Sequence, residues 1–448
     1  MKQKPADALI IGGGPAGACT AIALSRRGYT VDIIEREHFP RFHVGESLLP
    51  SVNPMLDSLG LTETLQKLPR ITKRGAEIVS AGQEDQGAML YFESGKRWGQ
   101  TETFNIERCV FDKAVLDFAA EQPGVTLHQG VGVQSIERLS QGDCALQTSA
   151  GPMHARMVID CSGQATVLGK HLGTKKVLEN HRKVAFVGHF TGVERLAGDA
   201  EGFISVVMAN EAWYWVIPID DQRTSIGLVV DKSASTAMRK QGVKPGEELA
   251  WSIARTPLLA KRTANATFPE TTWSVADFSY TCSPGAGDGY LMVGDAEAFL
   301  DPVFSSGVRL AIASALDAAH AADQVLSNDN PQRAKQHFLE RGAARRGLML
   351  HYINLFYSHP FRELLLQGKG PLGVHRALIA VLSGRFDDIP LSMRWRLKLL
   401  DFFHARQKSK GNMIPGRDGW SILENQQTTR DAACAYLHAI GHRYPLHN

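Results

Sequence analysis

Three glycines near the amino terminus have the spacing of a phosphate-binding loop. Gly12, Gly14 and Gly17 lie in ALIIGGGPAGACTAIAL, between a short apolar run and a helical run. Gly12 allows a tight turn, Gly14 lets the backbone approach a pyrophosphate, and Gly17 lets the helix pack closely on the strand. The helix begins near Ala16, so its first N–H groups would face the phosphates. Glu35 ends the next apolar run, where a carboxylate can bind a ribose 2′-hydroxyl. The stretch predicts a dinucleotide-binding βαβ unit, with a purely structural Gly-rich turn as the alternative.

A second stretch, FLDPVFSSGV, also has residue types that suit ligand binding. It follows the strand-like run YLMVGDA, which ends near Asp295. Pro302, the hydroxyls of Ser305 and Ser306, and Gly307 are typical of a helix N-terminus. The Ala/Leu-rich run after them predicts a long helix, so the loop would direct free N–H groups at a ligand.

Two more segments matter only in combination with these. Arg108 lies in NIERCVFDKAV, and DCSG follows the apolar run ARMVI. Read alone, Arg108 is a solvated helix charge and DCSG an ordinary turn. Together with the βαβ unit and the Gly-Asp at Asp295, they resemble the glutathione-reductase-type FAD proteins. The relevant branch holds aromatic hydroxylases, geranylgeranyl reductases and flavin-dependent halogenases. The resemblance implies that the cofactor contacts Gly12, Gly14, Ala16, Gly17, Glu35, Arg36, Ser47, Arg108, Asp295, Pro302 and Gly307.

Within this branch, the sequence is most similar to flavin-dependent halogenases that act on pyrroles and phenols. Their pattern F-x-x-P-x-F-S-x-G fits the stretch from Phe299 to Gly307, and W-x-W-x-I-P fits WYWVIP. Lys73 is followed, after one residue, by Gly-Ala, and so resembles the lysine that these halogenases carry in the corresponding segment. The alternative interpretation is that Lys73 is a solvated residue of a basic loop. Tryptophan-type halogenases carry a glutamate where this chain has Phe304, so a pyrrole- or phenol-like substrate is expected.

The resemblance implies a reaction and its participants. Chloride or bromide held near Ser306 and Gly307 would become hypohalous acid at the reduced FAD, and Lys73 would deliver it to an aromatic substrate. Reduced FAD would come from a separate flavin reductase or from NAD(P)H. Three side chains would line the substrate channel: Trp213, Trp215 and Phe304. The alternative is an FAD-dependent dehydrogenase, reductase or monooxygenase of a natural-product pathway.

The expected fold is α/β: a glutathione-reductase-type FAD-binding Rossmann fold with a mixed-sheet substrate domain and a helical C-terminal region. Four strands are predicted from KVAFVGHFTGV, EGFISVVMAN, EAWYWVIPI and TSIGLVV. The predicted divisions are an FAD-binding domain at 1–175 and 275–330, a substrate-covering sheet domain at 60–100 and 176–274, and the helical region at 331–448.

Composition restricts the class of protein and its partners. The chain has 448 residues, 44% of them hydrophobic, and a net charge of +3, which gives no argument for nucleic acid. Its six cysteines are scattered without zinc spacing, which favours a reducing compartment, no metal and a cytoplasmic location. No apolar run is long enough to span a membrane. The basic stretch at 392–410 is either a solvated helix face or a docking face for an acidic acyl carrier protein.

Overall fold

A computed structural model describes residues 5–82, 87–179, 182–276, 279–410 and 420–424. The chain divides into two compact units, and each is built from three separate segments. The first unit comprises Met1–Leu68, Glu107–Leu178 and Phe278–His351, and the second comprises Pro69–Ile106, Glu179–Asp277 and Tyr352–Asn448. The sequence-based boundaries remain a prediction; the structure itself assigns residues 331–351 to the first unit.

The first unit is organised around an eight-stranded sheet with a parallel centre. Strands β1 (Ala6–Ile11), β2 (Val31–Glu35) and β10 (Gly151–Asp160) pair in parallel, and further strands extend the sheet on both sides. The latter are β7 (Val125–Gln129), β8 (Val133–Arg138), β9 (Cys144–Thr148), β18 (Ala286–Gly287) and β19 (Tyr290–Met292). β1 reads ADALII and is nearly continuously apolar, as a strand buried on both faces must be. This confirms the predicted FAD-type α/β fold class.

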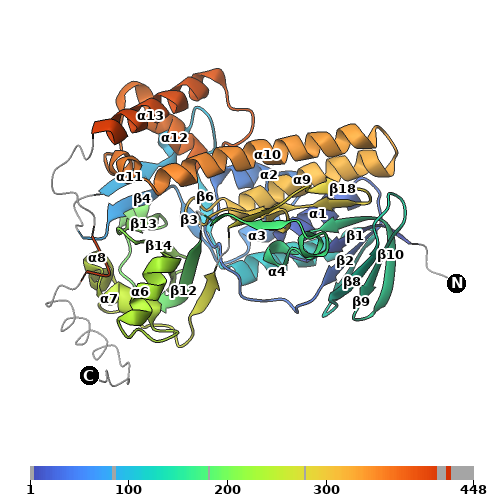
Figure 1. Cartoon of the computed structure of the whole chain (residues 1–448), viewed down its shortest axis with the longest axis horizontal. Helices are drawn as coiled ribbons and strands as arrows, with labels where there is room; N and C mark the ends of the chain where they lie inside the picture. Colours follow the sequence, from blue (N-terminus) through green and yellow to red (C-terminus); the bar gives the residue numbers. More distant parts are fainter. Residues whose placement is uncertain (1–4, 83–86, 180–181, 277–278, 411–419, 425–448) are drawn as a thin grey trace. The chain divides into compact units, whose positions relative to one another are not determined.

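Helices cover this sheet and position the residues discussed below. Helix α1 (Pro15–Ser25) packs against α9 (Gly307–Leu326) and α4 (Arg108–Ala120), as Figure 1 shows. All eleven residues of α1 are buried, and many are small, so the neighbouring helices can approach closely. The other elements of the unit are α2 (Asn53–Ser58), α3 (Thr62–Gln66), α5 (Val167–His171), β11 (Lys175–Val177), β17 (Tyr280–Cys282), β20 (Ala298–Phe299) and most of α10 (Pro331–Phe356).

The second unit contains a seven-stranded mixed sheet and a separate two-stranded pair. The four predicted strands are confirmed as β12 (Lys183–Thr191), β13 (Ile204–Met208), β14 (Ala212–Pro218) and β15 (Arg223–Asp231). The sheet is completed by β4 (Gly75–Ser80), β5 (Gly87–Tyr91) and β16 (Trp273–Ala276). The pair consists of β3 (Ile71–Lys73) and β6 (Thr103–Asn105).

Helices of the second unit include three that interrupt the region expected to be all sheet. These are α6 (Lys232–Lys240), α7 (Glu248–Ala254) and α8 (Pro257–Arg262). The predicted C-terminal helices are present as α11 (His359–Leu366), α12 (Val374–Leu382) and α13 (Leu391–Lys410). The prediction for 411–419 and 425–448 lies outside the described residues, and residues 420–424 are not helical. No helix in the described ranges is long and apolar enough to cross a membrane.

Candidate active site

The glycine loop between β1 and α1 has the geometry that its spacing predicts. Gly12 has φ +103°, a conformation that L side chains rarely adopt. A Cβ on Gly17 would lie 1.9 Å from the Gly12 carbonyl oxygen, so only glycine allows the helix to start this close to the strand. Gly14 is the N-cap of α1, and within the described structure no side chain caps this helix end. The first N–H groups of α1, next to Ala16, are therefore available to a phosphate.

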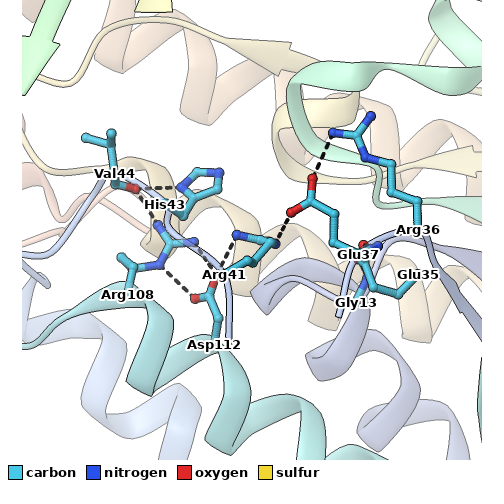
Figure 2. Close-up of polar contacts among 9 residues, drawn as sticks. All are labelled: Gly13, Glu35, Arg36, Glu37, Arg41, His43, Val44, Arg108 and Asp112. Carbon is cyan, nitrogen blue, oxygen red and sulfur yellow. Dashed lines mark hydrogen bonds and ion pairs between the residues drawn. The ribbon is translucent and has the colours of Figure 1, made fainter. Parts of the chain in front are cut away.

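Glu35 closes the loop from the end of β2, as Figure 2 shows. Its carboxylate accepts the Gly13 N–H at 2.7 Å and the Glu37 N–H at 2.8 Å. Each carboxylate oxygen can accept more than one hydrogen bond, so Glu35 can also bind a ribose hydroxyl. Arg36, predicted as a cofactor contact, extends into solvent with 68% of its side chain exposed and pairs with Glu37.

Arg108 connects the start of α4 to the segment 43–47, which reads HVGES (Figure 2). Its guanidinium donates to both Asp112 carboxylate oxygens, at 2.7 and 3.0 Å, and to the Val44 carbonyl at 2.7 Å. Arg41 contributes a second positive charge, with Nη1 3.5 Å from the Asp112 carboxylate. Arg108 is therefore a buried pair-forming residue and not a solvated helix charge, and it positions the segment leading to the buried Ser47.

Asp295 follows β19, where the chain turns through Gly294 at φ +59°. The Gly294 N–H donates to the Ser314 hydroxyl of α9 at 3.2 Å, which ties this turn to the helix. Burial raises the pKa of the Asp295 carboxyl to about 7, and the positive charge of Arg108 opposes this shift. Arg108 and Asp295 thus interact electrostatically, although they are 187 positions apart in the sequence.

The loop before α9 is compact and ends at an uncapped helix N-terminus. The Asp301 carboxylate accepts the Val303 N–H at 2.9 Å, and the Ser305 N–H donates to the Pro302 carbonyl at 3.0 Å. Ser306 is 2% exposed and occupies the N-cap position, yet its side chain caps nothing in the described structure. No described atom outside the neighbouring residues lies within 4 Å of the position that a Cβ would take on Gly307. Phe304, within this loop, is buried at 8% exposure.

Lys73 lies in the second unit, at the end of strand β3, and is only 1% exposed. The solvated-loop alternative is therefore wrong, because pairing with β6 carries this residue into the interior. Burial lowers the pKa of Lys73 from 10.5 to about 7. Its Nζ lies 5.3 Å from the centroid of the Phe92 ring, within range of a cation–π contact. Near pH 7, Lys73 is therefore present in both its protonated and its neutral form. The protonated form can donate a hydrogen bond, and the neutral form can act as a nucleophile.

Trp213 and Trp215 lie on one face of β14, also in the second unit, with ring centroids 5.9 Å apart. Their exposed fractions are 1% and 5%. Trp213 donates its indole N–H to the Tyr357 hydroxyl at 3.0 Å, and Trp215 donates to the Ser225 hydroxyl at 3.2 Å. Both polar atoms are thus satisfied by the protein, and the pair is a fixed aromatic surface.

Sequence reasoning missed several partners of these residues. Phe92 and Tyr357 gave no signal, because only the folded chain brings them to Lys73 and Trp213. The Arg108–Asp112 pair was visible as an i,i+4 spacing on a helix, but its burial was not.

The first unit contains donors and acceptors that fit a dinucleotide cofactor. It combines an uncapped helix start at the glycine loop with carboxylates at Glu35 and Asp295 and a second uncapped helix start at Ser306. Within the described ranges, no group of three His, Cys, Asp or Glu side chains could hold a metal ion.

Comparison with known proteins places this arrangement in a family. The tryptophan halogenase model matches residues 7–103 and 99–363. The 1H-pyrrole-2-carbonyl-(peptidyl-carrier protein) chlorinase of Pseudomonas fluorescens is 31% identical over 80% of this chain and 84% of its own. A solved flavoprotein/dehydrogenase from Cytophaga hutchinsonii is 27% identical with a TM-score of 0.81, covering 90% of this chain and 100% of that one. The solved flavin-dependent brominase Bmp2 is 26% identical with a TM-score of 0.79, at the same coverage. This chain belongs to the tryptophan halogenase family and is a flavin-dependent enzyme of the halogenase class, a class that uses FAD and halide.

Proposed function

We propose that this enzyme halogenates electron-rich aromatic rings by way of hypohalous acid delivered through Lys73. Bound reduced FAD supplies the chemistry that converts O₂, a halide ion and a proton into hypohalous acid, water and oxidised FAD. The acid then places its halogen on a ring carbon, and the ring proton leaves with the hydroxide as a second water. The observation that carries the proposal is the burial of Lys73 with its pKa lowered to about 7, in a chain of this family.

The proposed cofactor contacts all lie in the first unit. The glycine loop binds the pyrophosphate, Glu35 the ribose, and Asp295 the ribityl chain. Arg108 acts mainly by positioning the segment that includes Ser47. The exposure of Arg36 allows it only a contact at the surface of the cofactor. Chloride or bromide binds at the uncapped start of α9, where the N–H groups at Ser306 and Gly307 carry partial positive charge.

Lys73 has two possible modes of action, and both use its low pKa. The ammonium form donates a hydrogen bond to the oxygen of hypohalous acid, which makes the halogen more electrophilic. The amine form exchanges a hydrogen for the halogen, giving a haloamine and water. Trp213 and Trp215 are proposed to keep the substrate away from the cofactor and so favour halogenation over hydroxylation, and Phe304 is proposed to line the substrate channel.

The decisive experiment is Lys73→Ala, with the exposed Lys240→Ala as its matched control. We expect Lys73→Ala to lose halogenated product while it still binds FAD and releases peroxide from reduced flavin and O₂. Lys240→Ala should resemble the wild type, because surface substitutions away from the site remove no chemistry. Product formation by a folded, FAD-loaded Lys73→Ala enzyme would refute the role of Lys73.

The substrate is proposed to be a pyrrole- or phenol-like ring, and the partner a carrier protein that presents it. Phe304 stands where tryptophan-type enzymes have a glutamate, and the related Pseudomonas enzyme is named for a pyrrole on a peptidyl carrier protein. A separate flavin reductase is the proposed source of reduced FAD.

Helix α13 offers a surface that suits an acidic carrier protein. Exposed apolar and basic side chains alternate along it at helical spacing: Leu391, Arg394, Trp395, Lys398, Phe402 and Arg406. Asp401, the acidic residue of this helix, is only partly exposed. α13 also contacts the segment that follows Phe92, because the Trp98 indole N–H donates to Ser392 at 3.2 Å. Lys398→Glu should raise KM for carrier-bound substrate and leave a free thioester mimic unaffected, whereas Lys240→Glu should change neither.

A second candidate function, a flavin dehydrogenase acting on a C–C bond, is favoured by the similarity to the Cytophaga flavoprotein. Mass spectrometry with bromide in place of chloride separates the two. Halogenation gives a product with the bromine isotope doublet, and the dehydrogenase gives a two-hydrogen mass change.

A further inference from the structure

Asn105 in strand β6 has a buried amide oxygen without a hydrogen-bond partner among the described residues. The residue is 0% exposed, and its Nδ2 donates to the Gly202 carbonyl at 2.9 Å. A carbonyl oxygen can only accept, so Nδ2 must be the atom that faces Gly202, and Oδ1 is then available on the other side. Native proteins rarely leave a buried acceptor in this state, so the oxygen requires an explanation.

Asn105 shares a face of the two-stranded pair with Lys73. In this antiparallel pair Ile71 lies opposite Asn105 and Lys73 lies opposite Thr103, as the adjacent positions of β3 and β6 in Figure 1 also show. Side chains alternate between the two faces of a strand, so these four point to the same side. Lys73 and Asn105 are diagonal neighbours, which sets them roughly 7–8 Å apart at the backbone. The open acceptor of Asn105 and the amine of Lys73 therefore belong to one face of the same strand pair.

We propose that Asn105 Oδ1 accepts a hydrogen bond from an N–H or O–H group on the substrate ring, beside the carbon that receives the halogen. The inference rests on the proposed function of Lys73 and adds the group that recognises the substrate. The group that Asn105 would recognise is the ring N–H or O–H of the pyrrole- or phenol-like substrate proposed above.

The proposed contact assists the reaction as well as binding. When the halogen adds to the ring carbon, the ring becomes cationic and its N–H or O–H becomes a stronger donor. The hydrogen bond to Oδ1 therefore strengthens in the transition state, so its loss should lower kcat as well as raise KM. The ring carbon then loses its proton, which combines with the hydroxide of the hypohalous acid as water.

The test compares ring donors with their methylated counterparts in the wild-type enzyme loaded with FAD. The probes are pyrrole-2-carbonyl and 4-hydroxybenzoyl thioesters of N-acetylcysteamine, together with the N-methylpyrrole and 4-methoxy forms. We expect the wild type to prefer the donor-bearing ring of one pair by at least roughly tenfold in kcat/KM. A preference within the pyrrole pair shows that Asn105 binds a ring N–H, and a preference within the 4-hydroxybenzoyl pair shows that it binds a ring O–H.

Two substitutions at Asn105 separate substrate recognition from a structural role. Asn105→Leu and Asn105→Asp both remove the Nδ2 bond to Gly202, but only Asn105→Asp keeps an acceptor. Asn105→Leu should lose roughly tenfold in kcat/KM on the donor-bearing ring and lose the preference over the methylated ring, while Asn105→Asp keeps the preference.

The outcomes that contradict the inference differ from those that contradict the proposed function. Equal rates on donor-bearing and methylated rings in the wild type overturn the role of Asn105 and leave halogenation standing, even if neither variant folds. An unchanged preference in folded Asn105→Leu has the same meaning. No halogenated product from any of the four probes overturns the proposed function, and the inference with it.

Discussion

Replacing Lys73 with methionine should stabilise the protein while abolishing its proposed activity. Methionine has a similar length and no charge, so it removes the burial penalty of the ammonium group. Burial lowers the pKa of Lys73 from 10.5 to about 7. At pH 7 this difference corresponds to a penalty of about 4 kcal/mol on the free energy of unfolding. Lys73 also makes interactions that methionine cannot make, so we expect a net gain of about 2 kcal/mol.

The pH dependence of this gain follows from the same two pKa values. Between pH 7 and 10.5 the unfolded chain binds the Lys73 proton and the folded protein does not, so wild-type stability rises with pH. Below pH 7 the lysine is protonated in both states and the full penalty applies, and above pH 10.5 it vanishes. The advantage of Lys73→Met should therefore shrink steadily as the pH is raised.

Thermal unfolding of the two proteins at pH 7, 8, 9 and 10 measures this effect. A gain of about 2 kcal/mol should raise Tm by about 5 °C at pH 7, on the usual scale for a unit of this size. Exposed Lys240→Met is the control and should leave Tm nearly unchanged at every pH. A lower Tm for Lys73→Met, or a difference that does not vary with pH, would refute the assignment of Lys73 as a destabilising buried cation.

Three further substitutions test the supporting geometry. Gly17→Ala places a methyl group 1.9 Å from a carbonyl oxygen of the glycine loop, so the purified protein should lose the flavin absorbance of the wild type. Arg108→Met removes the bidentate partner of the buried Asp112 and leaves the more distant Arg41 beside it, so urea unfolding should show a loss of about 3–5 kcal/mol. Adding Asp112→Asn should restore part of that loss. Tyr357→Phe removes the acceptor of the Trp213 indole N–H, so the same assay should show a loss of about 1 kcal/mol.

Local sequence patterns predicted the elements whose determinants lie close together in the chain. The glycine loop and the four strands from β12 to β15 depend on spacing and alternation within about thirty residues or fewer, and the structure confirms both. Helices α6 to α8 were missed because each is short and lies between polar or Gly-containing segments.

Long-range contacts account for the rest of the candidate site. Lys73 lies in LPRITKRG, a stretch that is polar by composition, and only its pairing with β6 and the neighbouring Phe92 buries it. The sequence also could not predict that the Asn105 amide oxygen has no hydrogen-bond partner among the described residues, because this depends on where the Gly202 carbonyl lies in the fold. Residue spacing carries no information about such contacts between distant segments.

The interleaved order of the segments determines when the first unit of the protein can fold during synthesis. Helix α1 packs on α9, and about 280 residues separate the end of one from the start of the other. At ribosomal rates of about 5–20 residues per second, α1 waits roughly 15–60 s for its partner. Its small apolar residues remain uncovered by α9 during that time. Production of this enzyme should therefore respond strongly to chaperone supply and to lower growth temperature, and fragments that end before residue 307 cannot complete the unit.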